Sequence, residues 1–125
     1  MEFLRSRALQ FLEQANYAHQ RGYNELALFN VEQFFQLYVK YLLYKRLGEY
    51  PRTHSLKRLL EELVRLYQGC GISEYIRENS LIITLLEQAY ISSRYLPFEA
   101  DEGDVEAAMD AAKRALEIFK CLENL

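Results

Sequence analysis

The segment Tyr50–Leu56, with the sequence Tyr-Pro-Arg-Thr-His-Ser-Leu, combines side chains that could do chemistry within a short stretch. It holds Arg52, His54, which is one of only two histidines in the protein, and hydroxyl groups. A guanidinium binds phosphate through two parallel hydrogen bonds, and an imidazole exchanges a proton near neutral pH. Short polar connections between helices are also common places for function. We therefore predict a binding site at this segment.

The surroundings of the segment are basic, although the protein carries a net charge of −3. Residues 40–58 contain six basic residues and one acidic residue. Such a local excess attracts phosphate even on an acidic protein, whereas ordinary exposed helix charges would give the same count without any site. The overall charge argues against bulk binding of nucleic acid.

The spacing of residues gives little support for a metal site, a cofactor or a reactive cysteine. Neither His-x-x-x-His nor Cys-x-x-Cys occurs, so we predict no metal site and no cofactor. Cys70 and Cys121 have no histidine in their own segments, and a domain of 125 residues needs no disulfide, so we expect reduced thiols in a cytoplasmic protein. No apolar run is long enough to span a membrane, and the first residues lack the features of a signal peptide.

Helical periodicity covers nearly the whole chain and predicts one all-α domain over residues 1–125. Ser55 or Thr53 can cap the helix that follows the basic segment, and Asp104 can cap the last helix. Because the loops are short, we predict an antiparallel up-and-down bundle of four main helices plus a short extra helix. The periodic stretches cover residues 2–21, 24–47, 56–67, 73–78, 79–94 and 104–122.

The stretch 24–47 is apolar nearly all round and rich in aromatic residues. A central position in the bundle would explain part of this pattern, and the excess of aromatic residues predicts a second surface, most simply a homodimer. Glu32, Gln36 and Lys40 interrupt the pattern along one line, at positions i, i+4 and i+8. We include Glu32 and Lys40 among the predicted ligand-binding residues.

In an antiparallel bundle the helices at 24–47 and 79–94 finish at the same end of the molecule. This arrangement would place Arg52 and His54 close to Arg94 and Tyr95. Arginine suits a phosphate and tyrosine suits a nucleobase, so the four residues predict a ligand-binding end. Alternatively, Arg94 pairs with an acidic neighbour and His54 only helps to cap the following helix.

Three blocks of this chain resemble HEPN domains (higher eukaryotes and prokaryotes nucleotide-binding). Asn24–Gln33, with the sequence Asn-Glu-Leu-Ala-Leu-Phe-Asn-Val-Glu-Gln and followed by Leu37 and Lys40, is similar to the second-helix signature of the family. Tyr50–Leu56 and Ser93–Tyr95 are similar to two further blocks, in the same order. The resemblance covers nearly the whole chain and implies a helical bundle that is frequently a homodimer.

The resemblance also implies a nucleotide or RNA ligand. Small prokaryotic HEPN domains are often encoded beside a minimal nucleotidyltransferase, and several such pairs act as toxin and antitoxin. Many members are metal-independent ribonucleases with an Arg-x(4–6)-His motif. Here seven residues separate Arg46 from His54, and only one separates Arg52 from His54. We therefore predict a non-catalytic nucleotide-binding or partner-binding module, with a degenerate ribonuclease toxin that uses His54, or a purely structural interaction protein, as alternatives.

Overall fold

The computed structural model describes residues 1–95 and 99–125, and the side chains of these residues except 92–95. The described residues form six α-helices and no strand, which agrees with the predicted all-α class. None of these helices is both long and apolar enough to cross a membrane. The helices are α1 (Glu2–Gln20), α2 (Asn24–Leu47), α3 (Leu56–Leu66), α4 (Ile72–Glu78), α5 (Ser80–Tyr95) and α6 (Glu102–Glu123).

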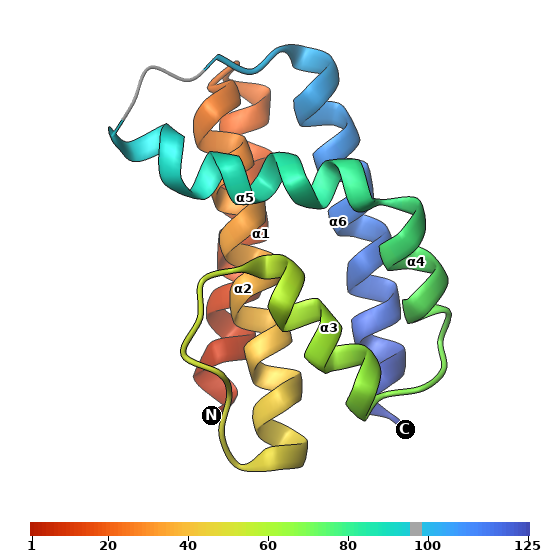
Figure 1. The fold of residues 1–125 in the computed structure, drawn as a ribbon. Coiled ribbons are helices and arrows are strands. Elements are labelled where there is room, and N and C mark those ends of the chain that lie inside the picture. Colours follow the sequence, from red (N-terminus) through yellow and green to blue (C-terminus); the bar gives the residue numbers. More distant parts are fainter. Residues whose placement is uncertain (96–98) are drawn as a thin grey trace.

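The arrangement of the helices differs from a simple up-and-down bundle. In Figure 1, α1 and α2 run alongside each other in opposite directions, and α6 descends beside them. α5 instead crosses in front of α1 and α2, and α3 is inclined to α2. The predicted bundle of four main helices is therefore not confirmed. The crossing of α5 brings its last turns above the segment that connects α2 to α3.

α2 is the central helix, because it packs against α1, α3, α5 and α6. Only Leu26 and Leu47, near its two ends, are exposed large apolar residues. The apolar character of α2 is thus explained within one chain, and the predicted homodimer loses this support and stays a prediction. The residues of α2 that are buried in the core include Phe34, Phe35, Tyr38, Val39, Leu42 and Leu43.

α6 begins at Glu102 because Asp101, rather than the predicted Asp104, is its N-cap. The side chain of Asp101 accepts a hydrogen bond from the backbone N–H of Asp104 at 2.8 Å. In return, the side chain of Asp104 accepts one from the backbone N–H of Asp101 at 3.4 Å. This reciprocal pair is a capping box, which satisfies two N–H groups that the helix itself cannot pair.

Cys70 and Cys121 form a disulfide, so our expectation of two reduced thiols was wrong. Cys70 lies in the turn between α3 and α4, and Cys121 lies in the last turn of α6. The residues are 51 positions apart in the sequence, and their Cα atoms are 6.1 Å apart in the structure. The spacing alone did not show this proximity because the path of α6 past α4 creates it. The cysteines therefore give no argument for a reducing compartment, and a cytoplasmic location stays a prediction.

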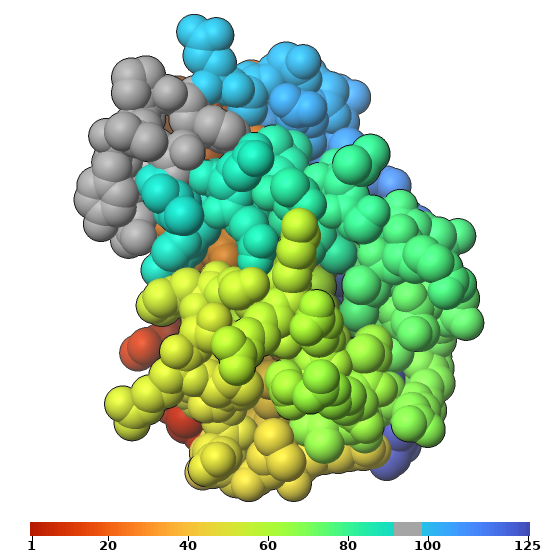
Figure 2. Space-filling model, in the orientation of Figure 1, coloured from red at the N-terminus to blue at the C-terminus, as the bar shows by residue number. Residues whose placement is uncertain are grey.

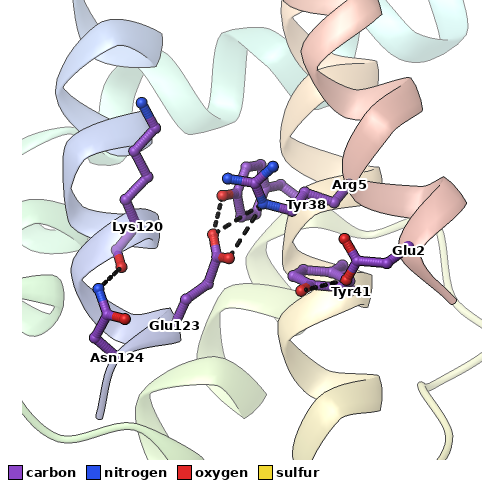
Figure 3. Close-up of polar contacts among 7 residues, drawn as sticks. All are labelled: Glu2, Arg5, Tyr38, Tyr41, Lys120, Glu123 and Asn124. Atoms are coloured by element: carbon purple, nitrogen blue, oxygen red, sulfur yellow. Dashed lines mark hydrogen bonds and ion pairs between the residues drawn. The ribbon is translucent and has the colours of Figure 1, made fainter.

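Two residues beyond Cys121, a polar cluster joins α1, α2 and α6 (Figure 3). Nε of Arg5 donates to both carboxylate oxygens of Glu123, at 3.1 and 3.2 Å, and the hydroxyl of Tyr38 donates to the same carboxylate. Burial and the neighbouring carboxylate raise the pKa of Tyr38, so that its hydroxyl stays a donor. The start of α1 and the end of α6 are thereby fixed to the central helix.

Candidate functional site

The segment between α2 and α3 ends in a helix cap that is bound to α5. Ser55, one of the two predicted capping residues, is the N-cap of α3, and its Oγ accepts the backbone N–H of Arg58 at 3.3 Å. The same hydroxyl donates to Oε1 of Glu87 at 2.8 Å, and Glu87 also accepts the backbone N–H of Lys57 at 3.1 Å. Glu87 is a residue of this region that the sequence did not indicate, since nothing in its own helix distinguishes it from a surface carboxylate.

His54 lies between this cap and the basic segment, and its side chain is held against α5. The His54 ring stacks on the ring of Tyr90, with centroids 5.3 Å apart and planes inclined by 20°. Phe29 of α2 lies on the Tyr90 ring as well, at 6.5 Å. The stack attaches the segment 48–55 to α5, and the two lie next to each other on the face shown in Figure 2, yellow below teal.

A surface cavity of about 700 Å³, which we call the loop cavity, is lined by residues 48–54 and by two residues of α2, Lys40 and Tyr44. Its lining brings together Lys40, Arg52 and His54, which are three of the six predicted ligand-binding residues. A second cavity of about 440 Å³ is lined by His54, Ser55 and residues of α5. His54 therefore borders both cavities.

The two cations of the loop cavity are free of ion pairs with the residues that the structure describes. Nζ of Lys40 lies 5.5 Å from the centroid of the Tyr50 ring, which is a cation–π distance. Burial lowers the pKa of Lys40, and the charge of Glu32 works in the opposite direction. Arg52 is exposed and makes neither a hydrogen bond nor an ion pair within the described part of the chain. Both side chains can therefore turn toward an anion.

Glu32 does not line the loop cavity but lies beneath the segment, fully buried. One of its carboxylate oxygens accepts from Nε2 of Gln33 and the other from Nε2 of Gln36, both at 2.8 Å. Burial raises the pKa of Glu32 to about 7, although both amides and the charge of Lys40 lower it. Glu32 is thus a buried group with a pKa near neutral pH, and its predicted role in ligand binding stays a prediction.

Gln36 links this buried carboxylate to the segment. Its Nε2 donates to Glu32 and also to the backbone carbonyl of His54, at 2.7 Å. Its Oε1 is buried and has no hydrogen-bond partner among the described residues. The polar line of Glu32, Gln36 and Lys40 in the sequence was the signal for this connection, and we had taken from it only the two charged residues.

Arg94 and Tyr95, the remaining predicted ligand-binding residues, lie in the last turn of α5. Arg94 follows Tyr90 by four residues, so its backbone is one helical turn beyond the ring that stacks on His54. The side chains of Arg94 and Tyr95 lie outside the described part of the structure. Their predicted contact with a ligand stays a prediction.

Elsewhere in the described chain, His19, Glu102 and Glu106 place their ligand atoms within 4.8 Å of one another. Nε2 of His19 lies 3.3 Å from Oε1 of Glu102, and this direct hydrogen bond explains their proximity without a metal. Both carboxylates are exposed. We derive no metal site from this group.

These features define a small helical domain with a basic cavity beside a polar interhelical segment. The family model of the HEPN domain matches residues 1–123, so the chain belongs to the HEPN domain family. A crystal structure of an archaeal HEPN homologue superposes with a TM-score of 0.68 at 28% sequence identity, over 95% of this chain and 93% of the homologue. The comparison with curated proteins gave no match. The HEPN membership that three sequence blocks indicated is thereby confirmed.

Proposed function

We propose that the protein is a binding module for nucleotides and that the loop cavity receives their phosphate groups. The observation that carries this proposal is the pair Lys40 and Arg52, which border one cavity without an ion-pair partner in the described structure. The lining has two cationic residues and one acidic residue, Glu49, and this excess of positive charge attracts an anion. The guanidinium of Arg52 can donate two parallel hydrogen bonds to a phosphate.

The aromatic lining supports a nucleotide rather than phosphate alone. Tyr44 and Tyr50 line the same cavity as the two cations. Stacking of a base on an aromatic ring contributes about 1–3 kcal/mol to binding and requires no particular base. A nucleoside monophosphate therefore presents both chemistries that the cavity offers, a charged group for Lys40 and Arg52 and a flat ring for a tyrosine.

Calorimetric titration with AMP, ATP and inorganic phosphate tests the proposal. We expect Arg52→Ala to weaken AMP binding about tenfold or more, because a lost charge-assisted hydrogen bond is worth about 1.5–3 kcal/mol. Arg65→Ala is the matched control, since Arg65 is an exposed arginine of α3 that pairs with Glu62 and does not line the cavity. Absence of heat at millimolar nucleotide would reject the nucleotide ligand.

Family membership supports two further proposals about partners. We propose that the chain forms a homodimer and that it binds a minimal nucleotidyltransferase as a cytoplasmic toxin–antitoxin or modification pair. Sedimentation at tens of micromolar protein tests the homodimer, and a purely monomeric species would contradict it. A nucleotidyltransferase in the neighbouring reading frame that co-purifies with the chain would support the pairing.

A second candidate function is metal-independent cleavage of RNA. Arg52 and His54 line one cavity, so a guanidinium and an imidazole border the same space. In such a reaction His54 would take the proton of a 2′-hydroxyl, and Arg52 would stabilise the charge that develops on the phosphate. RNA should then be cut in EDTA by wild type and by His19→Ala, but not by His54→Ala. Cleavage that survives His54→Ala would exclude His54 as the base.

A further inference from the structure

We propose that Gln36, oriented by Glu32, is a positioning residue that holds the main chain at His54 and thereby sets where the His54 ring lies. The consequence for ligand binding rests on the proposed function of the loop cavity. The positioning itself rests only on contacts between described residues, so each part can fail separately.

The position of this pair in the core calls for an explanation. Glu32 and Gln36 are 0% and 3% exposed, on a helix whose other inward residues are almost all apolar. Burying a carboxylate and an amide is unfavourable unless hydrogen bonds compensate for the lost water. An apolar side chain at either position would fill the space without that loss. The polar pair is therefore expected to have a task that packing alone does not require.

The hydrogen bonds show what that task is. Nε2 of Gln36 donates to a carboxylate oxygen of Glu32 at 2.8 Å and to the carbonyl of His54 at 2.7 Å. Turning the amide over would point Oε1 at the carbonyl of His54, which only accepts, and at a second acceptor whenever Glu32 is ionised, so these contacts oppose the flip. In this orientation Nε2 makes both donor contacts, and Oε1 has no partner among the described residues.

Gln33 completes the arrangement without touching the segment. Its Nε2 donates to the other carboxylate oxygen of Glu32 at 2.8 Å. Glu32 is thus held by two amides, and only the amide of Gln36 continues to His54. Gln33→Leu and Gln36→Leu are therefore matched substitutions. Each removes one hydrogen-bond donor to Glu32, and only Gln36→Leu releases the carbonyl of His54.

His54 is fixed at three neighbouring points. Its carbonyl is held by α2 through Gln36, its ring lies on Tyr90 of α5, and the following residue, Ser55, is bound to Glu87. Releasing the carbonyl would remove the hydrogen bond that restrains the segment at His54 on its α2 side. The ring would then leave Tyr90 for part of the time, and the wall that His54 forms for both cavities would move.

Proton NMR of the imidazole ring tests this inference without any ligand. The protein has two histidines, so His19 serves as the internal reference. The ring current of Tyr90 should shift the His54 ring signals, and Tyr90→Leu supplies their unstacked positions. We expect Gln36→Leu to move the His54 signals toward those positions, whereas Gln33→Leu should leave them in place. Unchanged His54 signals in Gln36→Leu, or equal shifts in both variants, would overturn the inference.

Two measurements keep the test decisive if Gln36→Leu does not fold. Gln36→Met keeps an unbranched side chain and removes both donors, and it should give the same shift of His54. In the wild type, the Nε2 protons of Gln36 should exchange with solvent far more slowly than those of Gln10 and Gln14, which are exposed. Equally fast exchange would contradict the buried contact.

Measurement of AMP binding then distinguishes the positioning role of Gln36 from the proposed nucleotide-binding function. We expect AMP affinity to fall by roughly tenfold in Gln36→Leu, as for the loss of one well-placed hydrogen bond, and to stay unchanged in Gln33→Leu. If the wild type binds no nucleotide, the proposed function fails while the NMR result still decides the positioning. If affinity falls without any movement of the His54 signals, the positioning role is rejected.

Discussion

The hydroxyl of Ser55 donates a hydrogen bond to Oε1 of Glu87 at 2.8 Å. The same carboxylate oxygen accepts the backbone N–H of Lys57 at 3.1 Å. One side chain of α5 thus binds both the capping residue and a first-turn N–H of α3, which has no intrahelical acceptor. Two helices that cross at an angle are joined in this way at the start of the shorter one.

Removal of this contact should weaken the fold measurably. We expect Glu87→Ala to lower the free energy of unfolding by about 1–2 kcal/mol, because it leaves the cap and the Lys57 N–H with poorer partners. Gln88→Ala, at the exposed neighbouring position of α5, is the control and should change stability by less than about 0.5 kcal/mol. Chemical denaturation measures both. Equal effects in the two variants would show that Glu87 contributes nothing through its contacts.

Glu32 should make stability depend on pH near neutrality. Its pKa rises from the ordinary 4.5 to about 7 on folding, so the folded chain binds this proton more tightly than the unfolded chain. The stabilisation is complete below pH 4.5 and is lost as the pH rises through 7. Relative to Glu32→Gln, the wild type should lose roughly 3 kcal/mol of unfolding free energy between pH 4.5 and 8. Urea denaturation curves that keep a constant separation across this range would contradict the raised pKa.

Reduction of the disulfide should destabilise the protein. Chain-entropy arguments give an upper value of about 4 kcal/mol for a bridge between residues 51 positions apart. We expect dithiothreitol to lower the urea midpoint of the wild type and to leave the double variant Cys70→Ala/Cys121→Ala unchanged. Mass spectrometry after alkylation of the native protein checks the pairing directly, since free thiols at both positions would exclude the bridge.

The hydroxyl of Tyr38 should contribute more to the free energy of unfolding than the hydroxyl of Tyr41 does. Both donate to carboxylates, Tyr38 to the half-buried Glu123 and Tyr41 to the exposed Glu2. We expect Tyr38→Phe to lower the free energy of unfolding by about 1–3 kcal/mol, and Tyr41→Phe to lower it by less, because water can replace the partner of Glu2. Thermal denaturation of the two variants measures the difference. If Tyr41→Phe lost more unfolding free energy than Tyr38→Phe, the prediction that the Tyr38 contact is the stronger one would be wrong.

Hydrophobic periodicity was sufficient to locate the helices, because each buries a continuous apolar face. The stretch 24–47 matches α2, and of the two predicted caps, Ser55 and Thr53, it is Ser55 that caps α3. Periodicity contains no information about crossing angles, so neither the path of α5 nor the meeting of Cys70 with Cys121 could be read from it. These features depend on contacts between residues that are distant in the sequence.

The candidate site was predictable to the extent that its residues are polar and close in sequence. Lys40, Arg52 and His54 border one cavity because Lys40 lies two turns before the end of α2 and the segment folds back alongside it. Gln36 was missed because it contacts the backbone carbonyl of His54 from α2, and Glu87 was missed because it accepts from Ser55 and Lys57 from α5. A polar residue within an apolar helix was the available sign for Gln36, whereas Glu87 had none.

The bridge between Cys70 and Cys121 closes residues 70–121 into a covalent ring that contains α4, α5 and most of α6. A protease that cuts the backbone once inside this ring therefore releases no fragment. The cut protein keeps its mass apart from one added water, and on a non-reducing gel its two pieces migrate as one species. Only a reductant separates them, so the lifetime of the nicked protein is set by the redox potential of its surroundings.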